Sequence, residues 1–218
     1  MSKENQKTLE VYKEKAKIYL ANSAKHDRVD IIKAKRKREK LELLIKENFS
    51  SLPEHAKVFE IGSGDGTNAK FIQSLGFTVT ASDTAEAFIE ATRNQNVKTI
   101  KFNVLEDEFF EKYFAIFCWR VFVHFTKEDA LKTIKKVYDV LEDGGIFIFN
   151  TINREFRDVD NEWIDFENEY HMGIKRYYNY FSKRELDDII QKTKFQIKKF
   201  YKEAGDNNNK WLVYVLKK

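Results

Sequence analysis

The chain has 218 residues and a formal net charge of +4, a length that suits one domain with a complete hydrophobic core. Hydrophobic residues make up 42% and aromatic residues 15%, which excludes an intrinsically disordered polymer. The 34% of charged residues and the lack of an apolar stretch long enough to span a bilayer exclude a membrane-embedded protein. The start of the chain is polar rather than signal-like, and the single cysteine, Cys118, cannot form an intrachain disulfide. We therefore expect a cytoplasmic protein with no membrane partner.

The first fifty residues are expected to form a helical cap. No glycine or proline precedes Pro53, and apolar residues recur at helical spacing from Leu9 to Leu20. A second helix is expected over residues 28–48, and the basic run of residues 33–38 lies near its start.

Short apolar strands alternate with helices in the middle of the chain. Residues 57–61 predict a strand, and the helix that follows has Ala69, Ile72 and Leu75 on its inner face. Further strands are expected at 77–81, 97–102, 114–119 and 146–149, and further helices at 84–93 and 127–141. The repeat of strand, helix and strand predicts a parallel sheet with right-handed crossovers.

The last third of the chain has a different pattern. Residues 153–181 are polar and aromatic without a clean period, which predicts a long connection at the carboxyl edge of the sheet. Residues 182–193 predict a helix, with Ser182 as its N-cap and Glu185 completing a capping box. Two strands of an antiparallel hairpin are expected at 195–201 and 211–216. The expected single domain, 1–218, thus has four segments: the cap 1–50, a cofactor-binding core 51–152, a substrate-covering segment 153–181, and a C-terminal helix and hairpin 182–218.

The strongest motif follows the first predicted strand and reads Glu60-Ile61-Gly62-Ser63-Gly64-Asp65-Gly66-Thr67. Glycines let the backbone approach a ligand closely, and the next helix offers its N-terminus. A dinucleotide loop would have glycine or alanine in place of Thr67 and would bring an anionic pyrophosphate beside Glu60. S-adenosylmethionine brings an ammonium and a sulfonium instead, which a carboxylate complements. The motif therefore favours the methyl donor; the remaining alternative is a tight turn without a ligand.

A second acidic residue, Asp83, ends the second predicted strand, 19 residues after Gly64. A carboxylate at this spacing can accept hydrogen bonds from both hydroxyls of a ribose. The alternative is a helix cap, because the next helix is expected to start at Thr84. The spacing favours the ribose role.

Taken together, these motifs resemble the class I S-adenosylmethionine-dependent methyltransferases of the small-molecule type. The resemblance rests on the order of Glu60-x-Gly62-x-Gly64-x-Gly66, Asp83 and the segment Leu141-Glu142-Asp143-Gly144-Gly145 before a strand. The segment Tyr12-x-x-x-Ala16-x-x-Tyr19 resembles the helix that lies over the cofactor in that family. Two departures are Glu142-Asp143, where the family often has lysine and proline, and Phe114, which replaces a largely structural aspartate.

The resemblance implies an α/β, Rossmann-like seven-stranded sheet of order 3-2-1-4-5-7-6, with strand 7 antiparallel and with an N-terminal helical cap. It also implies S-adenosyl-L-methionine as the cofactor. The scattered histidines and the single cysteine form no pattern with metal-ligand spacing, so no metal is expected. The residues expected to bind this cofactor are Tyr19, Glu60, Gly62, Ser63, Gly64, Gly66, Asp83, Thr84, Asn103, Val104 and Cys118. Asn103 would accept a hydrogen bond from the adenine amino group, and its alternative role is a turn asparagine.

His124 is the candidate catalytic base, because it follows the fourth predicted strand near the expected position of the methyl group. The sulfonium already activates that methyl group, but a hydroxyl acceptor must still lose its proton. The alternative is a buried histidine held by a backbone hydrogen bond. Cys118 is interpreted as a small apolar residue under the cofactor rather than as a nucleophile.

The acceptor is expected to contact residues that offer stacking faces and polar tips. These candidates are Arg120, His171, Arg176, Tyr177 and Tyr178. Arg120 would pair with a phosphate or carboxylate, or else with a surface acid. The aromatic residues of the covering segment would otherwise pack a lid without touching a ligand.

The expected function is methyl transfer to a small polar metabolite, namely O-methylation of a sugar or sugar-phosphate-like acceptor. The partner is thus a small, anionic or sugar-like molecule, and nucleic acid is not expected. One alternative is an RNA methyltransferase that uses the basic run 33–38, and a second is a non-catalytic module that binds S-adenosylmethionine. The sequence leaves the oligomeric state open.

Overall fold

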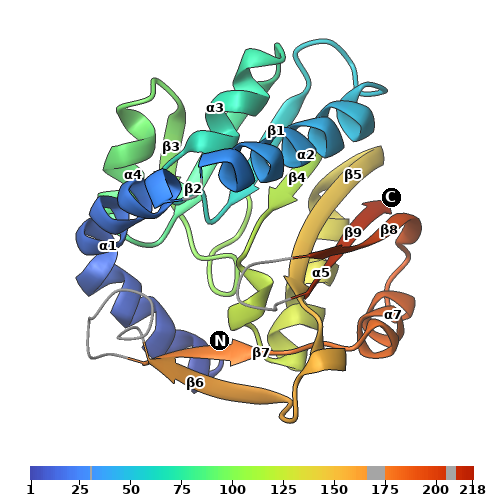
Figure 1. Cartoon of the computed structure of the whole chain (residues 1–218). Coiled ribbons are helices and arrows are strands. Elements are labelled where there is room, and N and C mark those ends of the chain that lie inside the picture. Colours follow the sequence, from blue (N-terminus) through green and yellow to red (C-terminus); the bar gives the residue numbers. More distant parts are fainter. Residues whose placement is uncertain (30, 166–174, 205–209) are drawn as a thin grey trace.

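The computed structural model describes residues 1–29, 31–165, 175–204 and 210–218 (Figure 1). Two helices, α1 (Lys3–Val29) and α2 (Ile31–Phe49), form the N-terminal cap, close to the predicted bounds. In Figure 1, α1 runs from β7 up to α4, and α2 continues across α3. The buried face of α2, with Leu44, Ile45 and Phe49, packs on the central sheet because these residues recur at helical spacing.

The central sheet has seven strands in the order β3-β2-β1-β4-β5-β9-β8. Its strands are β1 (Lys57–Ile61), β2 (Thr78–Asp83), β3 (Lys98–Lys101), β4 (Tyr113–Cys118), β5 (Leu141–Ile152), β8 (Gln196–Ala204) and β9 (Lys210–Lys217). The first five run parallel, whereas β9 pairs antiparallel with both β5 and β8. Because β8 and β9 are the sixth and seventh strands of this sheet in chain order, the predicted order 3-2-1-4-5-7-6 with strand 7 antiparallel is confirmed.

Helices cover both faces of the sheet. The crossover helices are α3 (Thr67–Ser74), α4 (Glu86–Arg93) and α5 (Lys127–Val140), and α7 (Lys183–Gln191) precedes the C-terminal hairpin. One apolar cluster joins α2 and α3 to the sheet, and a second joins α5 and α7 to its other face. The capping box of Ser182 and Glu185 is present at the start of α7 as predicted.

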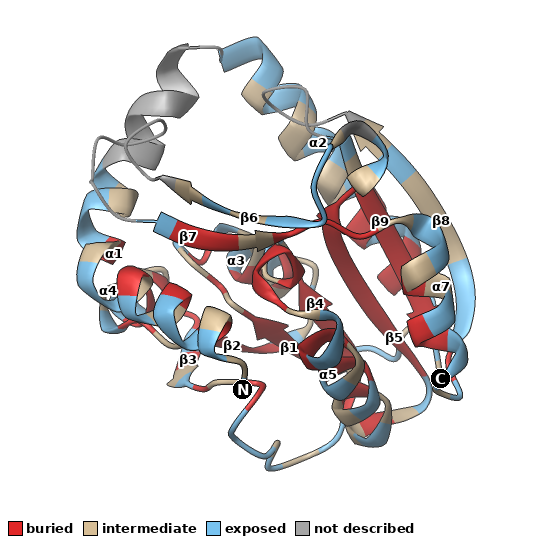
Figure 2. Ribbon diagram, turned by 90° about the horizontal axis from the view of Figure 1, so that it is seen from below, coloured by how far each residue is buried: buried red, intermediate tan, exposed pale blue. Residues whose placement is uncertain are grey.

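The segment expected to be an irregular connection contains a β-hairpin. Strand β6 (Asn161–Asp165) pairs antiparallel with β7 (Lys175–Asn179), in the register that sets Trp163 opposite Tyr177. In Figure 2, β6 is mostly exposed whereas β7 is mostly buried. Strand β7 contacts α1 and the 3₁₀ turn η1 (Phe122–His124), so neighbouring side chains on both of its faces are covered. The usual alternation of polar and apolar residues is therefore missing, and the sequence gives no period of two.

Candidate active site

The glycine loop connects β1 to α3 at the carboxyl edge of the sheet, where the end of β2 and the segment after β4 also lie. Gly62 and Gly66 have φ angles of 71° and 81°, which side chains with a Cβ rarely adopt. A Cβ on Gly62 would collide with the side chain of Val121, and one on Gly66 would lie 2.9 Å from the Cα of Thr92. Gly62 is therefore required by its positive φ angle and by the Val121 side chain, and Gly66 by its positive φ angle and by the backbone of Thr92, so the loop is held between α4 and the segment after β4.

Asp83 links the glycine loop to the start of α4. Its Oδ2 accepts a hydrogen bond from the Gly64 N–H at 3.1 Å, and its Oδ1 accepts from the N–H groups of Thr84 (2.7 Å) and Ala85 (3.1 Å). Burial raises the pKa of this carboxyl group, although the three backbone donors favour its ionised form. Asp83 therefore holds the glycine loop and the residues just before α4, but it is not the N-cap expected in the alternative, because α4 begins at Glu86 with Ala85 as its N-cap and has no side-chain capping bond. The ribose role stays a prediction.

Glu60 is a buried carboxylate at the end of β1. Its exposed fraction is 0%, and no described group donates a hydrogen bond to either carboxylate oxygen. Burial raises the pKa of Glu60, and the nearby Asn68 side chain and Ala69 N–H offset this only in part. A buried acidic group without hydrogen bonds is unfavourable unless a complementary charge joins it. The site therefore fits a cationic ligand.

Cys118 ends β4 directly beside β1, in register with Ile61. It is fully buried, and burial together with the charge of Glu60 raises the pKa of its thiol. A thiol with a raised pKa is a poor nucleophile. The structure thus places Cys118 as a small apolar residue within the core beside the glycine loop.

Asn103 and Val104 follow β3, as expected. The Asn103 side-chain oxygen accepts from the Leu105 N–H at 3.1 Å, and its amide donates to Glu106 Oε2 at 3.1 Å. These bonds are those of a turn asparagine, so the adenine contact stays a prediction. Val104 is buried in the hydrophobic core.

Aromatic residues of α1 lie over the start of α4. Tyr19 and Tyr12 pack edge-to-face, and both contact Phe88 with ring centroids 5.6 and 6.1 Å away. With Ala16 and Ala85 they form a small apolar cluster. This arrangement puts Tyr19 and Thr84 on neighbouring elements beside Asp83.

His124 belongs to the turn η1 after β4, at the predicted edge of the sheet. Its exposed fraction is 6%, and both ring nitrogens are hydrogen-bonded, Nδ1 to the Tyr177 carbonyl at 2.7 Å and Nε2 to the Tyr12 hydroxyl at 2.9 Å. Burial, and secondly the charge of Arg176, lower the pKa of His124 to about 3. His124 is therefore neutral at physiological pH.

Arg176 reaches the same cluster from β7. Its exposed fraction is 3%, its Nη1 donates to the Tyr12 hydroxyl at 2.7 Å, and its guanidinium lies over the rings of Tyr12 and Tyr178. The Tyr177 N–H donates to Thr8 Oγ1 at 3.0 Å. The structure brings the predicted residues Arg176, Tyr177 and Tyr178 together with His124; His171 lies outside the described residues.

Arg120 lies between β4 and η1 and has a φ angle of 62°. Its N–H donates to the side-chain oxygen of Asn150 at 2.6 Å, and its guanidinium lies over the ring of Trp211. It is exposed, and no carboxylate of the described residues forms an ion pair with it. The alternative role as an anchor for a surface acid thus has no support among the described residues.

The family follows from comparison of this geometry and sequence with known proteins. Residues 33–199 match the family model described as a methyltransferase domain. The chain belongs to the class I S-adenosylmethionine-dependent methyltransferases. No curated protein matches the chain.

Solved structures of low sequence identity share the fold of this methyltransferase. An S-adenosylmethionine-dependent methyltransferase from Clostridium acetobutylicum has a TM-score of 0.71 and 13% identity, over 91% of this chain and 98% of the other. One from Methanosarcina mazei has a TM-score of 0.68 and 16% identity, over 78% and 95%. The magnesium protoporphyrin IX methyltransferase of Synechocystis with bound S-adenosylmethionine has a TM-score of 0.66 and 12% identity, over 100% and 98%.

S-adenosylmethionine is the cofactor of this methyltransferase, and when bound it supplies the activated methyl group. The residues present fit it: Glu60 offers an uncompensated buried carboxylate, and Gly62 and Gly66 keep the loop free of side chains. Within the described ranges, no group of three or more histidine, cysteine, aspartate or glutamate side chains could hold a metal ion. None of the described helices of the methyltransferase is both long and apolar enough to cross a membrane.

Tyr12 lies in the site, although the sequence analysis named it only as part of the helix over the cofactor and not among the site residues. The signal was present, because Asn5, Thr8 and Tyr12 recur at helical spacing as a polar stripe on a face of α1 that also carries Val11. All three bond to η1 or β7: Asn5 Nδ2 donates to the His124 carbonyl at 3.3 Å, alongside the bonds of Thr8 and Tyr12.

Two surface hollows, of about 410 and 370 Å³, lie away from the glycine loop. The first is lined by residues that include Met1 and Asp129, the second by residues that include Lys7 and Trp163, and neither is lined by Glu60.

Proposed function

We propose that this methyltransferase transfers the methyl group to a hydroxyl of a small polar metabolite, a sugar or sugar-phosphate-like molecule. The observation that carries the proposal is the buried polar cluster of Tyr12, His124 and Arg176 beside Tyr178. The cluster joins α1, η1 and β7 at the carboxyl edge of the sheet, which is where ligands bind in open α/β folds. Hydrogen-bonding groups between aromatic faces suit a polar acceptor better than an apolar one.

The cofactor is proposed to lie along the edge formed by β1, β2 and β3. Glu60 complements the positive charge of S-adenosylmethionine. The loop of Gly62, Ser63, Gly64 and Gly66 offers a backbone surface against which the cofactor can lie. The other residues proposed to line it are Tyr19, Asp83, Thr84, Asn103, Val104 and Cys118. Asp83 is already held by three backbone N–H groups, so its carboxylate is fixed before a ribose binds.

The acceptor is proposed to lie between the segment after β4 and the hairpin of β6 and β7. Arg120 and Arg176 supply positive charge, and Tyr177 and Tyr178 supply the wall. Alignment of the acceptor oxygen with the methyl group and exclusion of water account for most of the acceleration such a site can give. His171, which lies outside the described residues, stays a sequence-based proposal for the same wall.

His124 is proposed to act on the acceptor's proton through Tyr12. Because Nδ1 donates to the Tyr177 carbonyl, Nε2 is the acceptor nitrogen and takes the hydrogen bond of the Tyr12 hydroxyl. When bound, the cofactor would supply the methyl carbon, whose bond to sulfur would break as its bond to the acceptor oxygen forms. The acceptor's proton would then pass to the Tyr12 oxygen while the Tyr12 proton passes to Nε2 of His124. Arg176 disfavours the resulting imidazolium, so the proton moves on to solvent. His124 is thus a positioning residue that gives weak basic assistance.

The proposal is tested by incubating the protein with labelled S-adenosylmethionine and matched pairs of small acceptors, each pair differing only in whether one hydroxyl is free or blocked. Transfer confined to the free-hydroxyl members is the expected result. Transfer to an amine or carbon acceptor only, or to RNA only, would refute O-methylation of a small molecule. Replacement of His124 by glutamine, which keeps one donor and one acceptor, separates its positioning role from packing.

A further inference from the structure

The segment after β4 carries an arginine in a strained conformation. Arg120 has a φ angle of 62°, in the left-handed region that glycine and asparagine tolerate but arginine rarely adopts. Its N–H donates to Asn150, which is 2% exposed and lies on β5. A strained residue persists only when its surroundings hold it, and such residues concentrate at functional sites.

Both neighbours of Arg120 are fixed as well. Trp119 stacks on Phe117 with an angle of 8° between the rings, and Val121 packs so closely on Gly62 that a Cβ there would collide with it. The backbone of Arg120 is therefore tied to the glycine loop on one side and to the sheet on the other. Its side chain starts directly beside the cofactor loop.

The guanidinium of Arg120 is held over the face of Trp211, 5.5 Å from the ring centroid. Trp211 lies at the start of β9 opposite Ile152, and β9 is separated from β4 in the sheet only by β5 (Figure 1). Because β9 runs antiparallel, its first residues reach the same carboxyl edge where the glycine loop lies. Trp211 and Tyr178 both pack on one buried cluster of Val123, Ile152 and Tyr180, and Tyr178 belongs to the proposed acceptor wall.

This cation has no anionic partner among the described residues, and it is exposed. An indole face restricts a guanidinium without neutralising it, so the outer N–H groups of Arg120 stay available to accept an anion in two-pronged fashion. Arg176, by contrast, is buried and already donates to Tyr12. Arg120 is thus the cation whose geometry suits an incoming ligand.

We propose that Arg120, positioned by Asn150 and Trp211, binds a carboxylate or phosphate of the acceptor and thereby makes the methyltransferase specific for anionic acceptors. This rests on the proposed function, because it places the acceptor beside the cofactor loop. The same chemistry could instead serve the carboxylate of the cofactor itself. The affinity for S-adenosylhomocysteine separates the two sources.

The test uses inorganic phosphate as the probe, titrated by calorimetry at low ionic strength into full-length protein saturated with S-adenosylhomocysteine. We expect saturable binding with a dissociation constant on the order of 1–10 mM. The variant Arg120→Gly keeps the N–H that Asn150 binds and relieves the strain, so its unfolding midpoint should stay within about 3 °C of wild type or rise. Its phosphate affinity should fall by at least about tenfold, with S-adenosylhomocysteine affinity unchanged.

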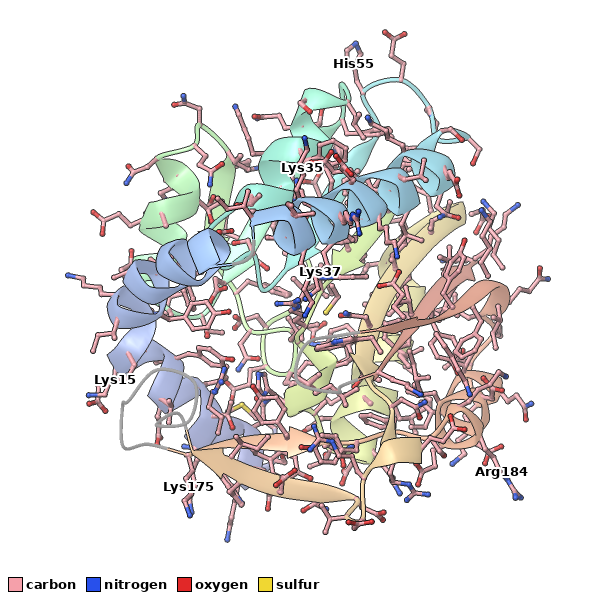
Figure 3. All side chains as sticks on the ribbon, in the orientation of Figure 1. Lys15, Lys35, Lys37, His55, Lys175 and Arg184 are labelled. Carbon is pink, nitrogen blue, oxygen red and sulfur yellow. The ribbon has the colours of Figure 1, made fainter. Side chains whose placement is uncertain are left out.

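Trp211 and a distant arginine provide the controls. Trp211→Ala should lower the phosphate affinity about threefold to tenfold, because the Arg120 guanidinium is no longer held over an aromatic ring. Trp211→Phe should keep most of the affinity because it retains an aromatic face. Arg184 points from α7 away from the sheet in Figure 3, so Arg184→Ala should bind phosphate as wild type does. A merely structural role for Trp211 would lower stability without this selective rescue.

Three results would overturn the proposal: wild-type protein that shows no saturable phosphate binding up to about 50 mM, Arg120→Gly that binds as wild type does, or Arg120→Gly that loses S-adenosylhomocysteine affinity. The last would assign Arg120 to the cofactor's carboxylate. A second phosphate titration without S-adenosylhomocysteine tests the anion site independently of cofactor binding. Wild-type protein that does not bind S-adenosylhomocysteine would count against the proposed function. Wild-type protein that binds S-adenosylhomocysteine but not phosphate would count against the anion site alone.

Discussion

The hydroxyl of Tyr12 lies 2.9 Å from Nε2 of His124, and this bond joins the N-terminal cap to the turn after β4. The other ring nitrogen bonds the Tyr177 carbonyl at 2.7 Å. A carbonyl only accepts, so Nδ1 carries the hydrogen and Nε2 accepts from Tyr12. The neutral imidazole is the form that the surrounding structure requires.

Protonation of His124 should make the fold less stable in acid. The pKa of His124 is about 3 in the fold and about 6.5 in an unfolded chain, so the unfolded state binds more protons between these values. The stabilisation is fully present above about pH 6.5 and is lost as pH falls toward 3, at up to about 1.4 kcal/mol per pH unit. Urea unfolding at pH 5.0 and 7.5 should show this slope. His124→Gln should remove most of this pH dependence of the free energy of unfolding, whereas replacement of the exposed His55 by glutamine should leave the pH dependence unchanged. Equal slopes in the two variants would contradict the lowered pKa.

Removal of the Tyr12 hydroxyl should destabilise the protein by about 1–3 kcal/mol, because Nε2 of His124 and Nη1 of Arg176 both lose a partner in a buried place. The change is Tyr12→Phe, measured by denaturant unfolding at pH 7.5. Tyr201→Phe is the matched control, since no hydrogen bond of the Tyr201 hydroxyl is present in the described structure, and it should cost less than about 0.5 kcal/mol. Similar losses in both variants would argue that the hydroxyl of Tyr12 has no special role.

Asp83→Asn should separate the two roles of Asp83. The amide keeps an oxygen for the N–H groups of Thr84 and Ala85, but its nitrogen cannot accept from the Gly64 N–H, so the free energy of unfolding should fall by about 1–3 kcal/mol in a variant that still folds. Loss of the negative charge beside the ribose hydroxyls should weaken the binding of S-adenosylhomocysteine by roughly 1–3 kcal/mol, and Asp83→Ala should have the same effect. Unchanged cofactor affinity in a folded variant would leave Asp83 with only a structural role between the glycine loop and the residues before α4.

RNA binding through α2 should be weak. Arg38 of the basic run is already used inside the protein, donating to Glu42 and to Asn68 at 2.7 Å each. If the run contacted phosphates, affinity would fall by about 0.7 log units per contact per log unit of salt. We expect filter binding to be lost near physiological ionic strength. Nanomolar binding that survives there would favour an RNA substrate.

The sheet was predictable from the sequence because buried parallel strands are short apolar runs and the glycine loop marks the first crossover. The hairpin of β6 and β7 was missed because β7 is covered on both sides, so its residues do not alternate. Among site residues, Glu60 was identified by its charge at the end of the first predicted strand, and Asp83 by its distance from Gly64. The bond between Tyr12 and His124 joins residues 112 positions apart, and sequence spacing carries no information on such a contact. The pairing of Arg120 with Trp211 was hidden for the same reason.

The charge complementarity of Glu60 is the central claim, and calorimetry of cofactor binding to wild type and Glu60→Gln tests it most directly. Wild type should bind S-adenosylmethionine with a micromolar-scale dissociation constant and should not bind NAD. Glu60→Gln removes a buried carboxylate without hydrogen bonds, so the variant should be at least as stable as wild type while binding S-adenosylmethionine at least about tenfold more weakly. Wild type that binds NAD but not S-adenosylmethionine, or a variant with unchanged affinity for S-adenosylmethionine, would contradict it.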